Sequence, residues 1–485
     1  MLIPAAEYAP DVADLNSSFS NAIQNVLCAS GGYIPAPALS ALTSALGEQP
    51  IGWLSVRSLD GSIRFFAGTP TKLFLLNNTD LTWTNVSKAA TVYNASVDVP
   101  WHMKAFGNFI IAVNQNDDPQ VYQIGTDVLF RNLGGSPPRA GRIAIWGDFV
   151  ALLDLTSNQN RVQWSGLNNC EFWTPGSNNS DYQDFPDGGR VTGSSDVTNP
   201  IVLLESAIQR ATFVPGSAEI FTFQKVQEMR GAKSPLSVAT RGSFVFFADA
   251  GGFFQCAADG SVSPIGFEKV DRTVFGKISV YGTSKIMGAI DPFYSRVYWA
   301  VDTNDDNRYE EMYVYDWQLQ KWTMISINVM GIFPFATSGY TLDGLDSVSS
   351  SLDALPFSLD SKVWDGGAPV LGSFTSDWKI GAFSGTNLEA TITTQEMGDT
   401  AGQVTRAVES APVVDTINTF VSIGVRMRRS DNVVWLPEQI PSTNTGVVKK
   451  RARARFMRFK TRIPAGVVWR NFKGIDVPTT PAGSR

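Results

Sequence analysis

Three stretches of the sequence share one pattern: AFGNFIIAVN at residues 105–114, IWGDFVALLD at residues 145–154 and TRGSFVFFAD at residues 240–249. Each has a short run of strand-forming residues, a glycine, a small polar residue, and a second run that opens with phenylalanine. Glycine at the first central position of a two-residue loop indicates a type II′ hairpin, because only glycine adopts a positive φ there at little cost. The pattern therefore predicts three equivalent hairpins.

These hairpins belong to a longer repeat, and their turn glycines are Gly107, Gly147 and Gly242. Repeat units begin near residues 51, 101, 141, 200, 236 and 285. Their spacing brackets the roughly 40–50 residues of a four-stranded propeller blade. The sequence therefore predicts a mainly β protein built around a β-propeller of about six four-stranded blades. A pair of β-sandwiches is the alternative architecture.

Four segments are expected along the chain. Residues 1–50 are an N-terminal arm with short helices, because apolar residues follow helical spacing over residues 17–28 and 38–46. Residues 51–330 hold the propeller-like repeats. A connector rich in Ser, Asp and Leu occupies residues 331–365, and a C-terminal β region that carries a basic strand occupies residues 366–485.

Composition excludes several classes of protein. Hydrophobic residues make up 43% of the chain, which is enough apolar material for a packed core and excludes a disordered chain. The net charge is −6, so there is no overall basic footprint of a duplex-binding protein. No apolar run approaches the roughly 18 residues of a membrane span, and no cation precedes Arg57. We expect neither a secretory leader nor stable membrane insertion.

The residues that most often carry catalysis or bind metals are few. His102 is the single histidine, so zinc sites with two or three histidines are excluded, and a structural role is favoured for it. Three widely spaced cysteines, Cys28, Cys170 and Cys256, indicate reduced thiols in the core.

Acidic residues also fit structural roles best. Asn114, Asp154 and Asp249 each lie seven residues after a turn glycine. A catalytic pair needs two different environments, so this recurrence indicates strand terminators. Residues 302–307 (DTNDDN) resemble a calcium loop but lack its glycine and its final glutamate, which favours a solvated acidic loop. No catalytic residue, metal or cofactor is predicted.

One charge feature stands out. Residues 449–462 (KKRARARFMRFKTR) hold eight cations and no acid. In a strand, alternate residues share a face, and the alternation changes side near Met457, which indicates a bulge or twist. The stretch could pair with acidic neighbours in an assembly, contact nucleic-acid phosphates, or be a solvated face. The interface or phosphate-contact candidates are Lys449, Lys450, Arg451, Arg453, Arg455, Arg458, Lys460 and Arg462.

Several stretches together resemble a known family. They are NAIQNV at residues 21–26, GGYIPAP at 31–37, SLDALPFSLDS at 351–361, WDGG at 364–367, ARFMRF at 454–459, IPAG at 463–466 and GIDV at 474–477. They resemble the tail nozzle or tail accessory structural proteins of short-tailed (podovirus-like) bacteriophages, and the resemblance runs from about residue 20 to residue 477.

The resemblance implies a non-enzymatic virion protein of the tail, assembled in the cytoplasm of the host bacterium. Its copies would form a ring, six-fold in the family, below the portal and adaptor. That ring would be the distal conduit through which genomic DNA passes transiently during ejection. The family brings no catalytic residues with it.

Two other functions remain open at this point. A head-completion protein that seals packaged DNA is the nearer one. The other is a tail protein that binds or cleaves carbohydrate on a propeller scaffold, with Trp146, Trp164 and Trp173 as aromatic platforms.

Overall fold

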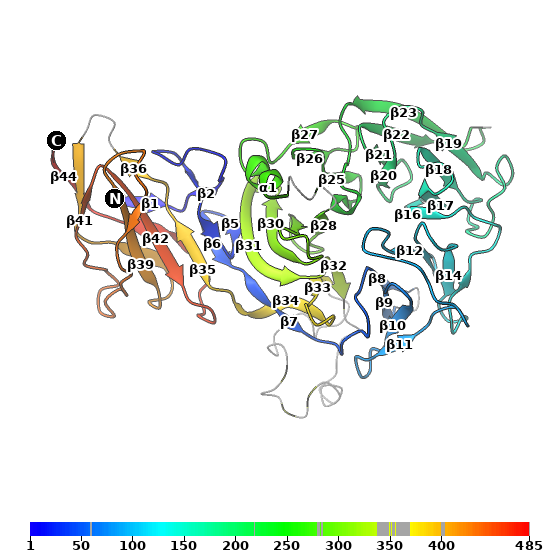
Figure 1. Cartoon of the computed structure of the whole chain (residues 1–485), viewed down its shortest axis with the longest axis horizontal. Helices are drawn as coiled ribbons and strands as arrows, with labels where there is room; N and C mark the ends of the chain where they lie inside the picture. Colours follow the sequence, from blue (N-terminus) through cyan, green and yellow to red (C-terminus); the bar gives the residue numbers. More distant parts are fainter. Residues whose placement is uncertain are drawn as a thin grey trace.

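The computed structural model describes residues 1–58, 61–217, 219–278, 282, 285–336, 349, 351, 355, 369–398 and 403–484. Over these residues the chain is mainly β, with one α-helix, α1 (Asp271–Ile278), and one 3₁₀ turn, η1 (Pro235–Ser237). Figure 1 shows two regions along the long axis of the molecule. No helix in the described part of the chain is long and apolar enough to cross a membrane.

Seven four-stranded antiparallel sheets make up the larger region. Six of them use four consecutive strands each: β8 (Gly52–Arg57), β9 (Ile63–Gly68), β10 (Leu73–Leu76) and β11 (Trp83–Asn85); β12 (His102–Phe106), β13 (Phe109–Val113), β14 (Gln120–Gln123) and β15 (Arg131–Asn132); β16 (Ala140–Trp146), β17 (Phe149–Leu155), β18 (Arg161–Trp164) and β19 (Asp181–Asp184); β20 (Val191–Ser194), β21 (Ile201–Leu204), β22 (Ala207–Phe213) and β23 (Phe221–Glu228); β24 (Ala239–Arg241), β25 (Phe244–Ala248), β26 (Phe253–Cys256) and β27 (Val262–Pro264); and β28 (Ile286–Ile290), β29 (Arg296–Val301), β30 (Tyr309–Asp316) and β31 (Lys321–Val329).

The seventh sheet joins distant parts of the chain. It contains β32 (Gly331–Ala336), β33 (Pro369–Phe374) and β34 (Ile380–Asn387), and its fourth strand is β7 (Pro37–Ala41) from the N-terminal segment. Gly381 pairs with Ala41 and Phe383 with Leu39. A strand that precedes the first sheet therefore completes the last one.

Each sheet packs on the next through an apolar layer, because alternate side chains of a strand point to opposite faces of its sheet. The pairs that share a buried cluster are Phe66 with Ile110, Ile111 with Leu152, Trp146 with Phe221, Leu203 with Phe247, Phe246 with Trp299, Met312 with Ile332, and Phe335 with Phe65. The last pair brings the seventh sheet back to the first. We call this closed arrangement the seven-sheet circuit.

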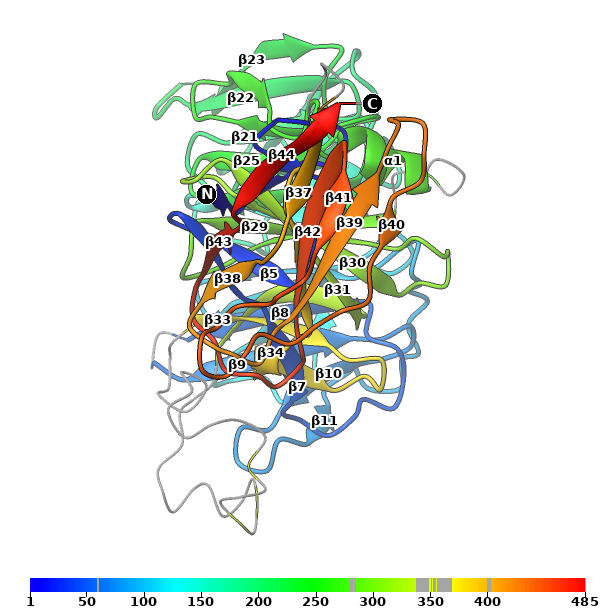
Figure 2. The same ribbon diagram turned by 90° about the vertical axis from the view of Figure 1, so that its left-hand side faces the viewer.

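The smaller region is the C-terminal β region, which Figure 2 views end-on with β37, β39, β41 and β42 side by side. Two of its sheets combine strands from both ends of the chain: β1 (Leu2–Pro4), β5 (Val26–Ala29), β6 (Gly32–Pro35), β38 (Ala411–Val414) and β43 (Phe472–Asp476); and β4 (Ile23–Gln24), β35 (Ala390–Thr393), β36 (Met397–Gly398), β39 (Phe420–Arg426), β40 (Val434–Trp435) and β42 (Phe456–Ile463). A third sheet holds β37 (Gln403–Ala407), β41 (Ala452–Ala454) and β44 (Thr479–Ser484), and β2 (Glu7–Tyr8) and β3 (Phe19–Ser20) form a short parallel pair.

The predicted N-terminal helices are wrong. Residues 17–28 form β3, β4 and β5, and residues 37–41 form β7. Asn25 has φ +60, which interrupts any helix between β4 and β5. The local apolar spacing misled the prediction: β4 and β7 pair with the distant strands β35 and β34, whereas β3 and β5 pair with the nearby β2 and β6.

The segment boundaries also differ from those expected. Residues 331–336, assigned to the connector, form β32, and residues 369–387, assigned to the C-terminal β region, complete the same sheet. The structure thus has seven four-stranded sheets where the repeat pattern indicated about six. Of the expected connector, residues 337–348, 350, 352–354 and 356–365 lie outside the described residues, as do residues 366–368, so WDGG at 364–367 does too.

Candidate functional sites

The repeat glycines occupy tight hairpin turns. Gly107, Gly147 and Gly242 have φ values of +58, +63 and +59, and each begins a two-residue loop. The flanking pairs, Phe106 with Phe109 among them, close the three loops in the same register. The residue after each glycine has no positive φ, which is the type II′ geometry expected from the sequence. These glycines are structural.

A polar residue closes the second strand of all seven sheets, at or next to its end. The seven are Thr69, Asn114, Asp154, Glu205, Asp249, Asp302 and Thr375. Asn114 Oδ1 accepts the backbone N–H groups of Asn116 and Asp117 at 2.8 Å each. Asp302 Oδ1 accepts those of Asn304 and Asp305 in the same manner. Three of these positions, Thr69, Glu205 and Thr375, escaped the sequence analysis because threonine or glutamate replaces the Asn/Asp signature there. Asp302 was considered only as part of the acidic 302–307 stretch.

The two carboxylates of this set that were considered for catalysis are held by arginines. Asp154 is 1% exposed and accepts two hydrogen bonds of 2.5 Å from Arg190. Burial raises the pKa of Asp154, against the opposing effect of that guanidinium. Asp249 pairs with Arg230 at 3.2 Å. Their side chains are therefore committed to holding neighbouring loops.

Three acidic residues in and beside the loop between β29 and β30 bring oxygens within 4.8 Å of one another: Asp302, Asp306 and Glu310. Asp302 has both carboxylate oxygens engaged with backbone N–H groups, and Lys285 Nζ lies 3.5 Å from it. The ammonium group of Lys285 competes directly with a metal ion for the Asp302 carboxylate. We therefore interpret this loop as a structural turn, stabilised by the hydrogen bonds of Asp302 and by its ion pair with Lys285.

Cysteine and tryptophan side chains are core residues. Cys28, Cys170 and Cys256 are free and buried, and burial raises their pKa values to about 12, 11 and 12. The three tryptophans considered as carbohydrate platforms are at most 3% exposed. Buried rings offer no stacking face to a sugar. Trp146, Trp164 and Trp173 are therefore core residues and not carbohydrate platforms.

The basic stretch leaves one sheet and enters another at Arg455. Residues 452–454 pair with β37 as β41, and residues 456–463 pair with β39 and β35 as β42. The expected change of side therefore falls at Arg455, two residues before Met457. Arg455 Nε is buried and has no hydrogen-bond partner among the described residues, and the guanidinium carbon lies 5.7 Å from the Phe456 ring centroid.

The eight cations fall into two groups of different exposure. Lys449, Arg451 and Arg453 are exposed. Arg453 donates to the Ala482 carbonyl at 2.9 Å. Among the residues that the structure describes, neither Lys449 nor Arg451 forms a side-chain hydrogen bond or ion pair. Lys450 is half-buried and donates to the Pro437 carbonyl.

The cations of β42 pair with acids of the same chain. Arg462 bonds Glu438 at 2.7 Å and Glu389 at 3.0 Å, and Lys460 lies 3.9 Å from Glu438. Arg458 is only 8% exposed, so it is not an interface candidate, contrary to the expectation from the sequence.

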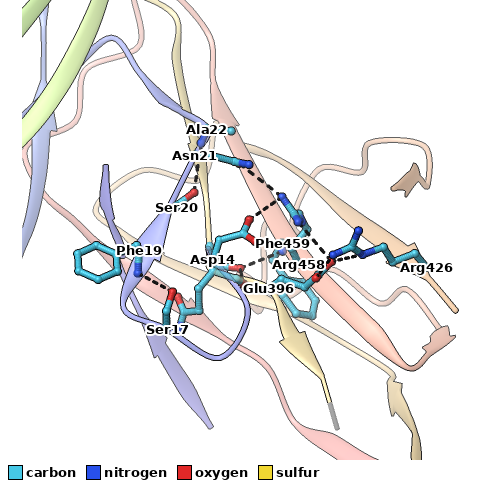
Figure 3. Close-up of polar contacts among 12 residues, drawn as sticks. Asp14, Ser17, Phe19, Ser20, Asn21, Ala22, Glu396, Arg426, Arg458 and Phe459 are labelled. Atoms are coloured by element: carbon cyan, nitrogen blue, oxygen red, sulfur yellow. Dashed lines mark hydrogen bonds and ion pairs between the residues drawn. The ribbon is translucent and has the colours of Figure 1, made fainter. Parts of the chain in front are cut away.

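Arg458 instead belongs to a buried ion network (Figure 3). It lies 2.9 Å from Asp14 and 3.3 Å from Glu396, and Arg426 Nε donates to Glu396 at 2.8 Å. Glu396 is 1% exposed. Two cations and two anions thus neutralise one another, which buried charges require. The network ties the N-terminal segment at Asp14 to β39, β42 and the residue before β36 in the C-terminal β region.

A cavity of about 490 Å³ lies among the first strands of the sheets. Its lining includes residues of β8, β12, β16, β24, β28 and β32, together with Arg190 beside β20. Six of the seven sheets therefore contribute strand residues to it, and Arg190 precedes the first strand of the remaining one. The size falls within the roughly 300–1,000 Å³ range of small-molecule sites.

The cavity holds more cations than anions. Three of its four cations are paired: Lys104 with Asp196 at 2.5 Å, Arg190 with Asp154, and Lys285 with Asp305 at 2.5 Å. The fourth, Arg142, is 8% exposed, and within the described residues its guanidinium has no hydrogen bond or ion pair. Burial lowers the pKa of Arg142 to about 10, so it stays charged at neutral pH. The lining acids are Asp98 and Asp302.

His102 lies next to Arg142 across the β12–β16 contact. Its Nδ1 accepts the Ile143 backbone N–H at 3.0 Å. Burial, Arg142 and Lys104 together hold the pKa of His102 well below its usual range, so the ring is neutral. Its proton is therefore on Nε2, since Nδ1 serves as an acceptor.

Comparisons with known proteins add little to this. No protein-family model matches the chain, and no curated protein matches it either. Among solved structures, the crystal structure of the computationally designed Ika8 protein is similar with a TM-score of 0.35 and 9% identity. The match covers 72% of this chain and 100% of that one. At that TM-score the similarity carries no argument about fold or function.

Proposed function

We propose that the protein is a non-enzymatic virion structural protein, a subunit of the tail nozzle of a short-tailed bacteriophage. The seven-sheet circuit is then a seven-bladed β-propeller whose last blade is closed by β7. Such a scaffold offers broad lateral surfaces for neighbouring copies, which suits a subunit of a ring. The resemblance of residues 21–37, 454–466 and 474–477 to nozzle proteins supports the same assignment.

The observation that carries the proposal is the exposed row of cations on and beside β41. Lys449, Arg451 and Arg453 point away from Ala452 and Ala454, which are buried. A rigid row of like charges is destabilising unless opposite charges approach it. The chain as a whole is acidic, with a net charge of −6, so a second copy supplies suitable partners. We infer that this row contacts a neighbouring subunit in a ring, six-fold by the resemblance, below the portal and adaptor.

A conduit for genomic DNA must also release it. Each phosphate that a protein neutralises adds a salt-dependent hold on DNA, which slows passage. An acidic chain whose β42 cations pair with acids of the same chain suits this requirement. Location in the virion tail, after assembly in the host cytoplasm, follows from the same proposal.

The test is the oligomeric state of the Arg451→Ser, Arg453→Ser variant. We expect the wild-type chain to form rings in size-exclusion chromatography with light scattering. The variant should need an at least about tenfold higher concentration to do so. Arg57→Ser with Arg308→Ser is the matched control, since both are exposed arginines outside the C-terminal β region.

Two results would contradict the proposal: a wild-type chain that stays monomeric at all concentrations, or a variant that assembles like the wild type. A low-resolution image of the virion would locate the protein independently. Density at the distal end of the tail is expected, whereas density at the head vertex would favour a head-completion role.

A further inference from the structure

We propose that the cavity of about 490 Å³ described above is a binding site for the phosphate group of a small molecule, with Arg142 and His102 as the hydrogen-bond donors. This inference does not depend on the proposed role in a phage tail. It rests on two donors that line one cavity and lack acceptors in the described parts of the chain.

The first donor is an unpaired buried cation. Arg142 lies on β16, is only 8% exposed, and is one of the residues that line the cavity. The Asp154 carboxylate opposes the lowering of the Arg142 pKa, but both of its oxygens already accept hydrogen bonds from Arg190. A buried charge without a partner is costly, so an anion that enters the cavity recovers much of that cost.

The second donor is a neutral imidazole with a fixed tautomer. His102 Nδ1 is occupied by the Ile143 N–H, and Ile143 follows Arg142 directly on β16. His102 Nε2–H is thus available to an oxyanion beside the guanidinium. A guanidinium fork together with an N–H donor is suited to the several oxygens of a phosphate group.

The surrounding charges favour an anion over a cation. Lys104, Arg190 and Lys285 also line the cavity, and although each is paired, they outnumber Asp98 and Asp302. The cavity is also larger than phosphate itself. Apolar lining residues such as Trp53, Met287 and Phe333 leave room for the organic part of a phosphorylated compound.

The experiment measures binding of inorganic phosphate to the full chain by equilibrium dialysis, at constant ionic strength set with sodium chloride. Saturable binding of one phosphate per chain is expected. Arg142→Met should weaken it at least tenfold, while Arg161→Met, at a surface arginine paired with Asp184, should leave it unchanged. Because the charge removed at Arg142 is unpaired, the variant should melt no lower than the wild type without phosphate.

A pair of variants at His102 makes the test independent of the Arg142 variant. Gln has an oxygen to accept the Ile143 N–H and an NH₂ group to donate, so His102→Gln should retain binding within about threefold. His102→Phe removes both groups and should weaken it at least tenfold. Binding of glucose 6-phosphate and of glucose then shows whether an organic phosphate is the ligand. We expect glucose 6-phosphate to bind more tightly than inorganic phosphate and glucose not to bind. Absent saturable binding, or equal binding by the wild type, Arg142→Met and His102→Phe, would overturn the proposal.

Discussion

The seven-sheet circuit and the C-terminal β region use the same antiparallel sheets but are stabilised by different means. In the circuit, each sheet packs on the next through apolar and aromatic side chains, as in the cluster around Trp146. In the C-terminal β region, a buried network of Asp14, Glu396, Arg426 and Arg458 joins segments from both ends of the chain. Neighbouring sheets of a repeat can rely on non-directional burial, whereas strands from distant segments are also held by specific charge pairs.

The largest loss of stability is expected from Trp146→Ala. Trp146 is fully buried, its ring centroid lies 5.2 Å from that of Phe221, and its Nε1 donates to Ser194 Oγ at 3.0 Å. Removing the ring leaves a cavity between two sheets and should cost about 3–5 kcal/mol. Urea unfolding measures this cost. A loss below about 1 kcal/mol would mean that apolar layers do not dominate the circuit.

Glu396→Gln should cost about 3 kcal/mol, because it leaves the partly buried Arg426 without a counter-charge and the buried Arg458 with Asp14 alone. Hydrogen exchange should speed up in β39 and β42 but not in the circuit. The matched control is Glu438→Gln, which breaks an exposed pair with Arg462 and should cost at most about 1 kcal/mol. Equal costs for the two variants would contradict the distinction between the regions.

The smallest effect tests the repeat turns. Gly107→Ala should cost about 1–2 kcal/mol, since φ is +58 there and a new Cβ would meet nothing within 4 Å. The cost is then purely that of the backbone conformation. Gly47, equally open but without a positive φ, is the control, and Gly47→Ala should be neutral or slightly stabilising in thermal melts. A neutral Gly107→Ala would remove the reason for glycine in the repeat.

The same contrast explains what could be predicted from the sequence. The mainly β class and the hairpins at Gly107, Gly147 and Gly242 were evident, because a two-residue turn is specified by adjacent residues. The strand nature of residues 17–28 was not: β4 pairs with β35, which lies more than 300 positions away, although β5 pairs with the neighbouring β6. Pairing across such distances leaves no local signature.

The candidate sites also divide into features specified by adjacent residues, which were predicted, and features that depend on distant residues, which were not. The basic stretch at residues 449–462 was visible as a run of charge, but the burial of Arg458 depends on Asp14 and Glu396, which are remote in sequence. His102 was noted only as the single histidine. Its proximity to Arg142 arises from the packing of β12 on β16, and no sequence motif in either strand predicts that proximity.

The closure of the seventh sheet by β7 has a consequence for synthesis of the chain. β7 leaves the ribosome before the first sheet is made, whereas β34, its partner, is translated after nearly the whole circuit. At a translation rate of roughly 5–20 residues per second, β7 remains without its partner β34 for on the order of tens of seconds. Throughout that interval the nascent polypeptide holds an unpaired edge, and polysomes crowd many such edges together. Exchange of β7 between nascent copies is therefore the misassembly that this topology must avoid.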